Sequence, residues 1–170
     1  MSAKSLFSFP HPVNEVSARL VAGGVVLMAL TAIVFQQPWI TLVLAYGFVA
    51  RVLTGPTLSP LGQLVTRVVV PRLRVPPKYV AGPPKRFAQG IGAVVTTSAA
   101  VAYFGFGSEP VAYVLLGAIT VAATLESVFA ICLGCIIFGQ LMRWHVIPDE
   151  VCEACNNLQL RQPEVTRSAA

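Results

Sequence analysis

Four cysteines arranged as two pairs carry the most evident chemistry in this sequence of 170 residues. Cys132 and Cys135 form the first Cys-x-x-Cys pair, Cys152 and Cys155 form the second, and the chain contains no other cysteine. Paired thiols can bind a metal as thiolates or exchange with a disulfide. Cysteine is also a small apolar residue that membrane helices tolerate, so inert packing is a third interpretation.

The metal interpretation rests on spacing. The two pairs are separated by 16 residues, and C-x2-C-x16-C-x2-C fits a four-cysteine zinc site that would join the tail to the last helix. His145 is a candidate fifth ligand. The context is unfavourable, because Cys132 and Cys135 fall in an apolar helix where a doubly anionic site is costly to desolvate.

The redox interpretation takes Cys132 and Cys135 as the working pair and Cys152 and Cys155 as a relay. Two dithiols in sequence can pass oxidising equivalents or persulfide sulfur by exchange. Residues three apart in a helix have Cβ atoms about 5–6 Å apart, whereas a disulfide needs about 3.8 Å. Closing the first pair would therefore distort a regular helix, and Gly134 makes that distortion easier.

Glu126 is the other candidate functional residue, because an acidic side chain within a membrane helix is costly and usually faces the bundle interior. At 100° per residue it lies about 120° from Cys132 and about 180° from Cys135, so a straight helix does not point it at the thiols. We expect a protonated Glu126 bonded to a hydroxyl among residues 96–98, with a proton relay as the alternative.

The composition identifies the class of protein that must position these residues. The chain is 55% hydrophobic and 11% charged, with a mean hydropathy of +0.72, whereas an average soluble protein is about 25% charged. The excess apolar surface must face lipid. The net charge of +5 comes with no base-reading motif, which argues against nucleic-acid binding. Residues 1–18 show no secretory signal.

The apolar runs predict an all-α membrane protein with a bundle of four transmembrane helices. The expected spans are 16–35, 38–53, 87–106 and 111–142. The second is short, so a re-entrant hairpin over 16–53 is the alternative, and the fourth must tilt or extend beyond the membrane. Small residues at four-residue spacing in the third, Gly92, Thr96 and Ala100, predict a packing seam.

The loop 54–85 between the second and third spans is predicted to contain an amphipathic helix on the cytoplasmic membrane surface. Ser59-Pro60 is a helix start, and one apolar face follows it. The prolines at 76–77 and 83–84 predict an irregular stretch. We expect residues 1–157 to form one domain and 158–170 a disordered tail.

The positions of the basic residues predict how the chain is oriented in the membrane. With four spans, all 12 Lys and Arg residues fall on one side, since the connections at 36–37 and 107–109 contain none. The positive-inside rule makes that side the cytoplasm. This predicts a multi-pass protein of the bacterial inner membrane with both termini cytoplasmic. Glu15 and Arg19 are expected to form an i,i+4 ion pair.

At these residues the chain resembles a bacterial membrane family, domain-of-unknown-function family 4395. The resemblance covers roughly residues 13–142. It is carried by Arg51, Ser59-Pro60, Arg86-Phe87-Ala88 with Gly90 and Gly92, Leu125-Glu126, Phe129 and Cys132-Leu133-Gly134-Cys135. A tyrosine is usual after the signature, where Ile136-Ile137-Phe138 stand here, and the pair Cys152 and Cys155 lies outside the family core. The resemblance implies a small four-helix membrane protein associated with thioredoxin-like and sulfurtransferase partners.

Together these observations favour an integral membrane thiol protein of sulfur or thiol–disulfide redox metabolism. One alternative is a non-enzymatic scaffold stapled by zinc. Another is a transporter of a small sulfur-containing solute, which would need a homo-oligomer because four helices enclose only a thin pore.

Overall fold

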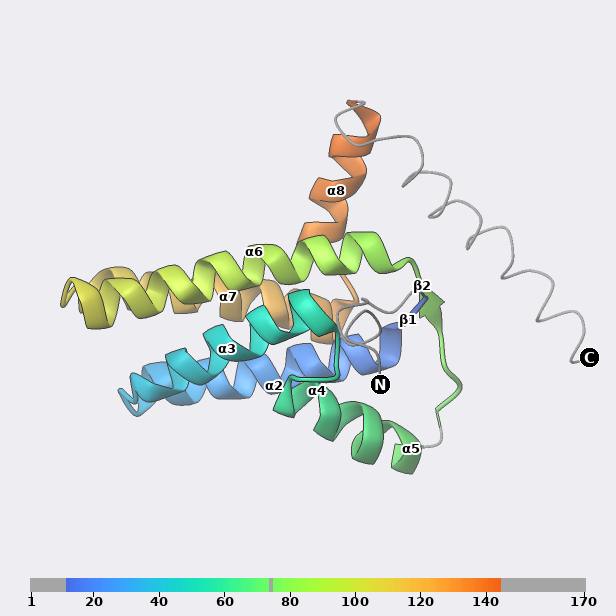
Figure 1. Cartoon of the computed structure of the whole chain (residues 1–170), viewed down its shortest axis with the longest axis horizontal. Coiled ribbons are helices and arrows are strands. Elements are labelled where there is room, and N and C mark those ends of the chain that lie inside the picture. The colour runs from blue at the N-terminus through green and yellow to red at the C-terminus, as the bar shows by residue number, and fades with distance from the viewer. Residues whose placement is uncertain (1–11, 74, 145–170) are drawn as a thin grey trace, which may run out of the picture.

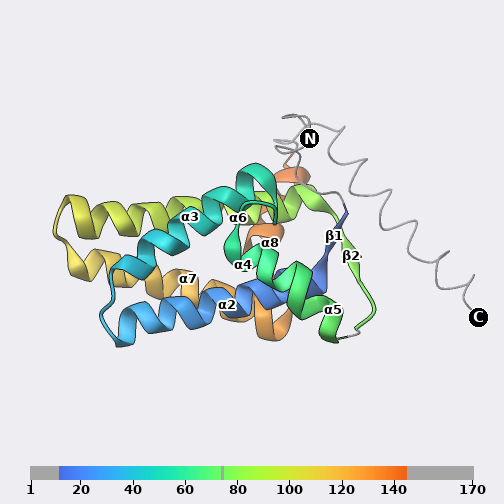
Figure 2. The same ribbon diagram turned by 60° about the horizontal axis from the view of Figure 1, so that its bottom comes forward.

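The computed structural model describes residues 12–73 and 75–144. His145, Cys152, Cys155 and the predicted tail therefore lie outside the described residues. Four helices run side by side in antiparallel fashion (Figures 1 and 2). They are α2 (Glu15–Val34), α3 (Trp39–Thr54), α6 (Gly82–Ala100) and α7 (Glu109–Phe129). A π-helical segment, η2 (Val101–Gly105), continues α6.

The bundle has two unlike ends. The short connections at 35–38 and 106–108 lie together at one end, which we call the turn end (Figure 1). The opposite end, which we call the thiol end, holds the loop from α3 to α6 and the end of α7. The α2 helix packs mainly along α7, and α3 packs along α6. Leu44, Leu116 and Val25 are almost completely buried in the core between them.

In the part of the chain that the structure describes, three helical segments are long and apolar enough to cross a membrane: Glu15–Val34, Gly82–Gly105 and Glu109–Phe129. The second predicted span, α3, has 16 residues, a rise of about 24 Å against a hydrocarbon core of about 30 Å. The structure therefore confirms an all-α protein with helices suited to a membrane, but it does not confirm the predicted count of four spans. Large apolar side chains such as Leu27, Val94 and Val114 remain more than 60% exposed on the outer faces, as lipid contact requires.

The predicted seam on α6 is confirmed. Gly92, Thr96 and Ala100 are all buried. A Cβ atom on Gly92 would lie only 2.3 Å from the ring of Phe48 on α3, so this position needs glycine. Small residues at four-residue spacing thus let α3 and α6 approach closely.

The amphipathic segment after α3 begins where predicted. It comprises α4 (Pro60–Leu64), the π-helical η1 (Val65–Val69) and α5 (Val70–Leu73). The Ser59 hydroxyl accepts a hydrogen bond from the Gly62 N–H at 3.2 Å, which caps the first turn. Leu61 packs over Gly24 of α2, where a Cβ atom would lie 2.7 Å from its side chain.

A two-residue antiparallel pair joins β1 (Val13–Asn14) to β2 (Tyr79–Val80). The Glu15 carboxylate forms an ion pair with Lys78 at 2.7 Å beside it. The predicted pair between Glu15 and Arg19 is therefore wrong. A local i,i+4 pair is weak, and the strand pairing brings a competing lysine close to the carboxylate.

The α6 helix begins at Gly82, five residues before the predicted start at Phe87. Pro83 and Pro84 were expected in an irregular stretch, but they occupy its first turn. Proline is tolerated there because the first N–H groups of a helix have no intrahelical partner. This earlier start makes Lys85 a helical residue that packs toward α7.

The predicted span 111–142 is not one helix. The α7 helix ends at Phe129, Ala130 adopts the left-handed conformation with φ 58° and ψ 20°, and α8 (Leu133–Arg143) leaves the bundle at a steep angle (Figure 1). Arg19 explains the break. Its guanidinium donates hydrogen bonds to the backbone carbonyls of Ser127 at 3.0–3.1 Å and Val128 at 3.0 Å. These carbonyls are ones that a helix end leaves unpaired.

Close packing fixes the direction of α8. A Cβ atom on Gly134 would lie 2.5 Å from the Cα atom of Ala88, so α8 touches the backbone of α6. Four residues on, the ring of Phe138 packs on Phe87 with centroids 5.6 Å apart. Gly134 was expected to ease distortion of the helix, and its observed role is this contact.

Candidate thiol site at the break between α7 and α8

The break determines how the two described cysteines are placed. Cys132 is the N-cap residue of α8, with extended backbone at φ −95° and ψ 103°, and Cys135 lies in the first turn. Both are free thiols, Cys132 buried and Cys135 half-buried. The predicted obstacle to a disulfide, the Cβ separation within a regular helix, does not apply because Cys132 precedes the helix.

The two thiols differ in acidity. A hydrogen bond from Cys135 stabilises the thiolate of Cys132, and with help from the charge of Lys85 it lowers the pKa of Cys132 to about 7 against the opposing effects of burial and Glu126. The same hydrogen bond, followed by burial, raises the pKa of Cys135. One thiol is therefore prepared to act as a nucleophile near neutral pH, while the other keeps its proton.

Glu126 pairs with Lys85 of α6. The carboxylate oxygen lies 2.6 Å from the Lys85 Nζ, and the two side chains are only 15% and 10% exposed. The expected bond from Glu126 to a hydroxyl among residues 96–98 is therefore wrong. The Thr96 hydroxyl donates to the carbonyl of Gly92 at 2.7 Å instead. The Glu126 carboxylate therefore accepts from Lys85 in a buried ion pair.

Arg51 of α3 is a second buried cation, with 6% exposure. Its Nε donates to the Gln89 side-chain oxygen at 2.9 Å, and its Nη1 donates to the Ser59 hydroxyl at 3.2 Å. The guanidinium also lies 4.4 Å from the centroid of the Phe48 ring. In the sequence, Arg51 stood out only as one of the residues that carry the family resemblance. The available signal was an arginine following an aromatic residue by three positions at the end of an apolar run.

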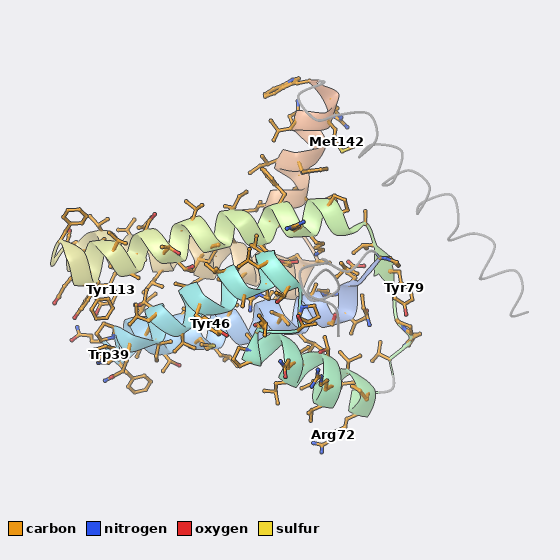
Figure 3. All side chains as sticks on the ribbon, viewed as in Figure 1. Trp39, Tyr46, Arg72, Tyr79, Tyr113 and Met142 are labelled. Carbon is orange, nitrogen blue, oxygen red and sulfur yellow. The ribbon has the colours of Figure 1, made fainter. Side chains whose placement is uncertain are left out.

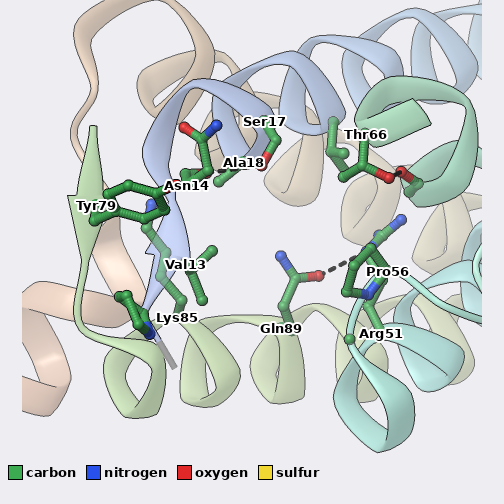
Figure 4. A pocket seen from close by; sticks show the side chains of 14 residues that line it. Val13, Asn14, Ser17, Ala18, Arg51, Pro56, Thr66, Tyr79, Lys85 and Gln89 are labelled. Atoms are coloured by element: carbon green, nitrogen blue, oxygen red, sulfur yellow. Dashed lines mark hydrogen bonds between the residues drawn. The ribbon is translucent and has the colours of Figure 1, made fainter. Parts of the chain in front are cut away.

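Several openings surround these groups, and one of them, of about 240 Å³, is lined by Arg51 and Ser59. An inner cavity of about 190 Å³ is lined by Arg51, Glu126 and Cys132, and an outer groove of about 430 Å³ is lined by Lys85, Cys132 and Cys135. Cys132 lines both, so its sulfur lies between the bundle interior and the surface. A further opening, the arginine cavity, measures about 250 Å³ and lies between α2, α3, η1 and α6 (Figure 4).

The structure brings together some of the site residues predicted from the sequence and leaves others apart. Glu126 and Cys132 line one cavity although a straight helix would have separated them, because the turn at Ala130 redirects the chain. Among residues 12–73 and 75–144, no group of three or more His, Cys, Asp or Glu side chains is placed to hold a metal. Cys132 and Cys135 alone can supply two thiolates, and the other predicted ligands lie outside the described residues.

Comparison with known proteins gives one match. A family model described as "Domain of unknown function (DUF4395)" matches residues 13–143. No curated protein matches the chain, and neither does any solved structure. The matched range includes all the elements just described, from β1 to α8.

Proposed function

The chain belongs to the family described as Domain of unknown function (DUF4395), and we propose that it is a membrane thiol protein that exchanges disulfides or sulfur through Cys132 and Cys135. The physiological partner in this proposal is a cytoplasmic thioredoxin-like or sulfurtransferase protein. Cys152 and Cys155 would relay between that partner and the buried pair.

One observation carries the proposal: Cys132 is the N-cap residue of a helix that starts at a backbone break, and a second free thiol, Cys135, lies three residues later in the first turn of that helix. A cysteine at a helix N-terminus near a lysine favours its thiolate. Two thiols in contact titrate in two steps whatever their role, so the support comes from position. Cys132 lines both the inner cavity and the outer groove, and Lys85 lines the groove beside it.

The proposed reaction is a two-electron exchange. The Cys132 thiolate attacks one sulfur of the partner disulfide, forms a mixed disulfide and releases one partner thiolate, which takes up a proton. Cys135 then loses its proton and attacks the Cys132 sulfur, so that an internal disulfide forms and the second partner thiolate leaves. The partner disulfide is reduced and the dithiol is oxidised; oxidation of a partner dithiol is the reverse sequence.

We further propose that α3 serves as a fourth, short span, so that both chain termini face the cytoplasm of a bacterial inner membrane. Support comes from the distribution of charge, because Arg51, Lys85 and Arg19 belong to the thiol end whereas the two turns at the other end contain no basic residue. An impermeant maleimide added to intact spheroplasts should then leave Cys132 and Cys135 unlabelled. Labelling from outside would overturn this topology.

The exchange is tested with purified protein in lipid nanodiscs and a purified thioredoxin that keeps only its first active-site cysteine, activated beforehand as a mixed disulfide with 5-thio-2-nitrobenzoate. The attacking thiolate displaces the thionitrobenzoate anion, and the partner has no second thiol with which to release the protein–protein disulfide that forms. Cys152→Ser and Cys155→Ser are present throughout, to isolate the buried pair. The Cys135→Ser variant should accumulate a mixed disulfide through Cys132, and the matched Cys132→Ser variant should not. Equal trapping by both variants, or trapping by neither, would contradict the proposal.

A further inference from the structure

We propose that the arginine cavity is a binding site for a small oxyanion, held by the guanidinium of Arg51. The cavity has room for such a ligand, with a volume of about 250 Å³. Besides Arg51, it is lined by the cation Lys85 and by the polar side chains of Gln89, Asn14 and Ser17. None of the 14 described residues that line it is acidic.

The charges around the cavity do not cancel. Two buried cations, Arg51 and Lys85, share one carboxylate, Glu126, and that carboxylate lies 2.6 Å from Lys85. In the described part of the chain, Arg51 makes no salt bridge, and its hydrogen-bond partners Gln89 and Ser59 are neutral. A buried charge without a counterion is costly. An anion beside Arg51 would neutralise the excess positive charge.

Hydrogen-bond donors are also available. Of the five N–H groups of a guanidinium, those on Nε and Nη1 of Arg51 have partners, while Nη2 has none among the residues that the structure describes. Gln89 binds Arg51 through its oxygen. Figure 4 shows the Gln89 amide nitrogen turned away from Arg51 toward the open space of the cavity. A planar guanidinium fork and an amide N–H suit the oxygens of a carboxylate, sulfate or phosphate group.

Such a group can come from a soluble anion or from the headgroup of an anionic lipid, since the cavity lies at the thiol end near the predicted membrane surface. Inorganic sulfate is a probe for the first source. We would titrate it into the full-length protein in nanodiscs of zwitterionic lipid and follow binding by calorimetry. Phosphatidylglycerol that remains bound through detergent washing, measured by mass spectrometry, reports the second source.

Binding of either probe should fall at least tenfold in Arg51→Gln. Arg67→Gln removes an exposed cation from the neighbouring η1 segment and should leave binding unchanged. Ala18→Leu fills the cavity from α2 without altering a charge, and it should also abolish binding, so it decides the outcome if the Arg51 variant does not fold. Binding of sulfate would identify the ligand as a soluble anion, and retained phosphatidylglycerol would identify it as a lipid headgroup.

The proposal is overturned if neither probe binds the wild-type protein, or if binding survives in both Arg51→Gln and Ala18→Leu. It stands apart from the thiol chemistry, because Cys132 does not line this cavity. Cys132→Ser should therefore bind the anion as the wild type does while losing disulfide exchange. The failure of one proposal can thus be told from the failure of the other.

Discussion

The two ends of the bundle are built from the same four helices yet differ in almost every polar property. At the turn end, Trp39 packs on Phe104 with ring centroids 5.4 Å apart, and Glu109 is the only acidic residue there among those that the structure describes. At the thiol end, the pair of Lys85 and Glu126 is buried close to two thiols and to the openings described above. Figure 3 shows the contrast in its labelled residues, with Trp39 and Tyr113 at one end and Arg72 and Tyr79 toward the other.

Backbone regularity accounts for much of the difference. At the turn end each connection is a few residues long, so the helices leave little space for polar side chains. At the thiol end a broken helix and a long connection provide irregular backbone, where side chains such as Val75, Phe129 and Ile131 are more than 40% exposed. Lipid-exposed irregular backbone does not occur within the hydrocarbon region, so in the proposed topology these segments lie outside it. The end with irregular backbone is therefore the end where charges, thiols and cavities occur together.

The largest effect is expected from removing one partner of the buried ion pair. Lys85→Ala leaves the Glu126 carboxylate unpaired, and it should lower the free energy of unfolding by about 3–5 kcal/mol. Glu109→Gln at the turn end should change it by less than about 0.5 kcal/mol. Unfolding by detergent titration, followed by circular dichroism, measures both. Similar small losses for the two variants would remove the distinction between the ends.

Next in size is the contact that holds α8. Gly134→Ala places a Cβ atom 2.5 Å from the Cα atom of Ala88, and it should cost about 2 kcal/mol by overpacking. The matched change is Gly139→Ala on the same helix, where no atom lies within 4 Å and alanine should stabilise by about 0.5–1 kcal/mol. The same unfolding titration applies. If Gly134→Ala is neutral, α8 is not anchored on α6.

The third prediction concerns thiol acidity. With Cys152 and Cys155 replaced by serine, alkylation of Cys132 by iodoacetamide should rise with pH around a midpoint of about 7, because a lowered pKa supplies thiolate at lower pH. Cys135→Ala removes the hydrogen-bond donor and should move the midpoint upward. A reference thiol at the turn end, from Phe106→Cys, should show the ordinary value of about 8.5. Equal midpoints for Cys132 and the reference would contradict the prediction.

The smallest effect is expected at a helix cap. The Asn14 side chain accepts a hydrogen bond from the Val16 N–H at 3.0 Å, whereas Ser108 at the turn end makes no side-chain cap bond. Asn14→Ala should therefore cost about 1 kcal/mol, and Ser108→Ala should cost a few tenths at most. Thermal midpoints in one detergent compare them directly, and the reverse order would show that capping does not distinguish the ends.

The sequence was sufficient where structure depends on local pattern. Apolar runs predicted helices close to the observed α2 and α3, the serine and proline at 59–60 predicted the start of α4, and four-residue spacing predicted the Gly92 seam. Each of these depends on residues that are near one another in the chain. The class of fold therefore followed from hydropathy alone.

The candidate site could be predicted only in part, because distant partners determine it. Neither proline nor glycine marks the break at Ala130, and alanine rarely adopts a positive φ. The break is stabilised by Arg19, which lies 108 residues before its first partner, Ser127. In the same way, the partner of Glu126 depended on where α6 begins. Helical periodicity cannot reveal an ion pair between side chains 41 residues apart.

The arginine bond that stabilises the end of α7 also has a consequence for biogenesis. Since Arg19 lies in the first helix and its carbonyl partners in the last one of the bundle, the bend that shapes the thiol pair cannot be held in place until both have been inserted and have met. Under the proposed function, the reactivity that this bend confers on Cys132 and Cys135 is therefore acquired only after α2 and α7 have packed together.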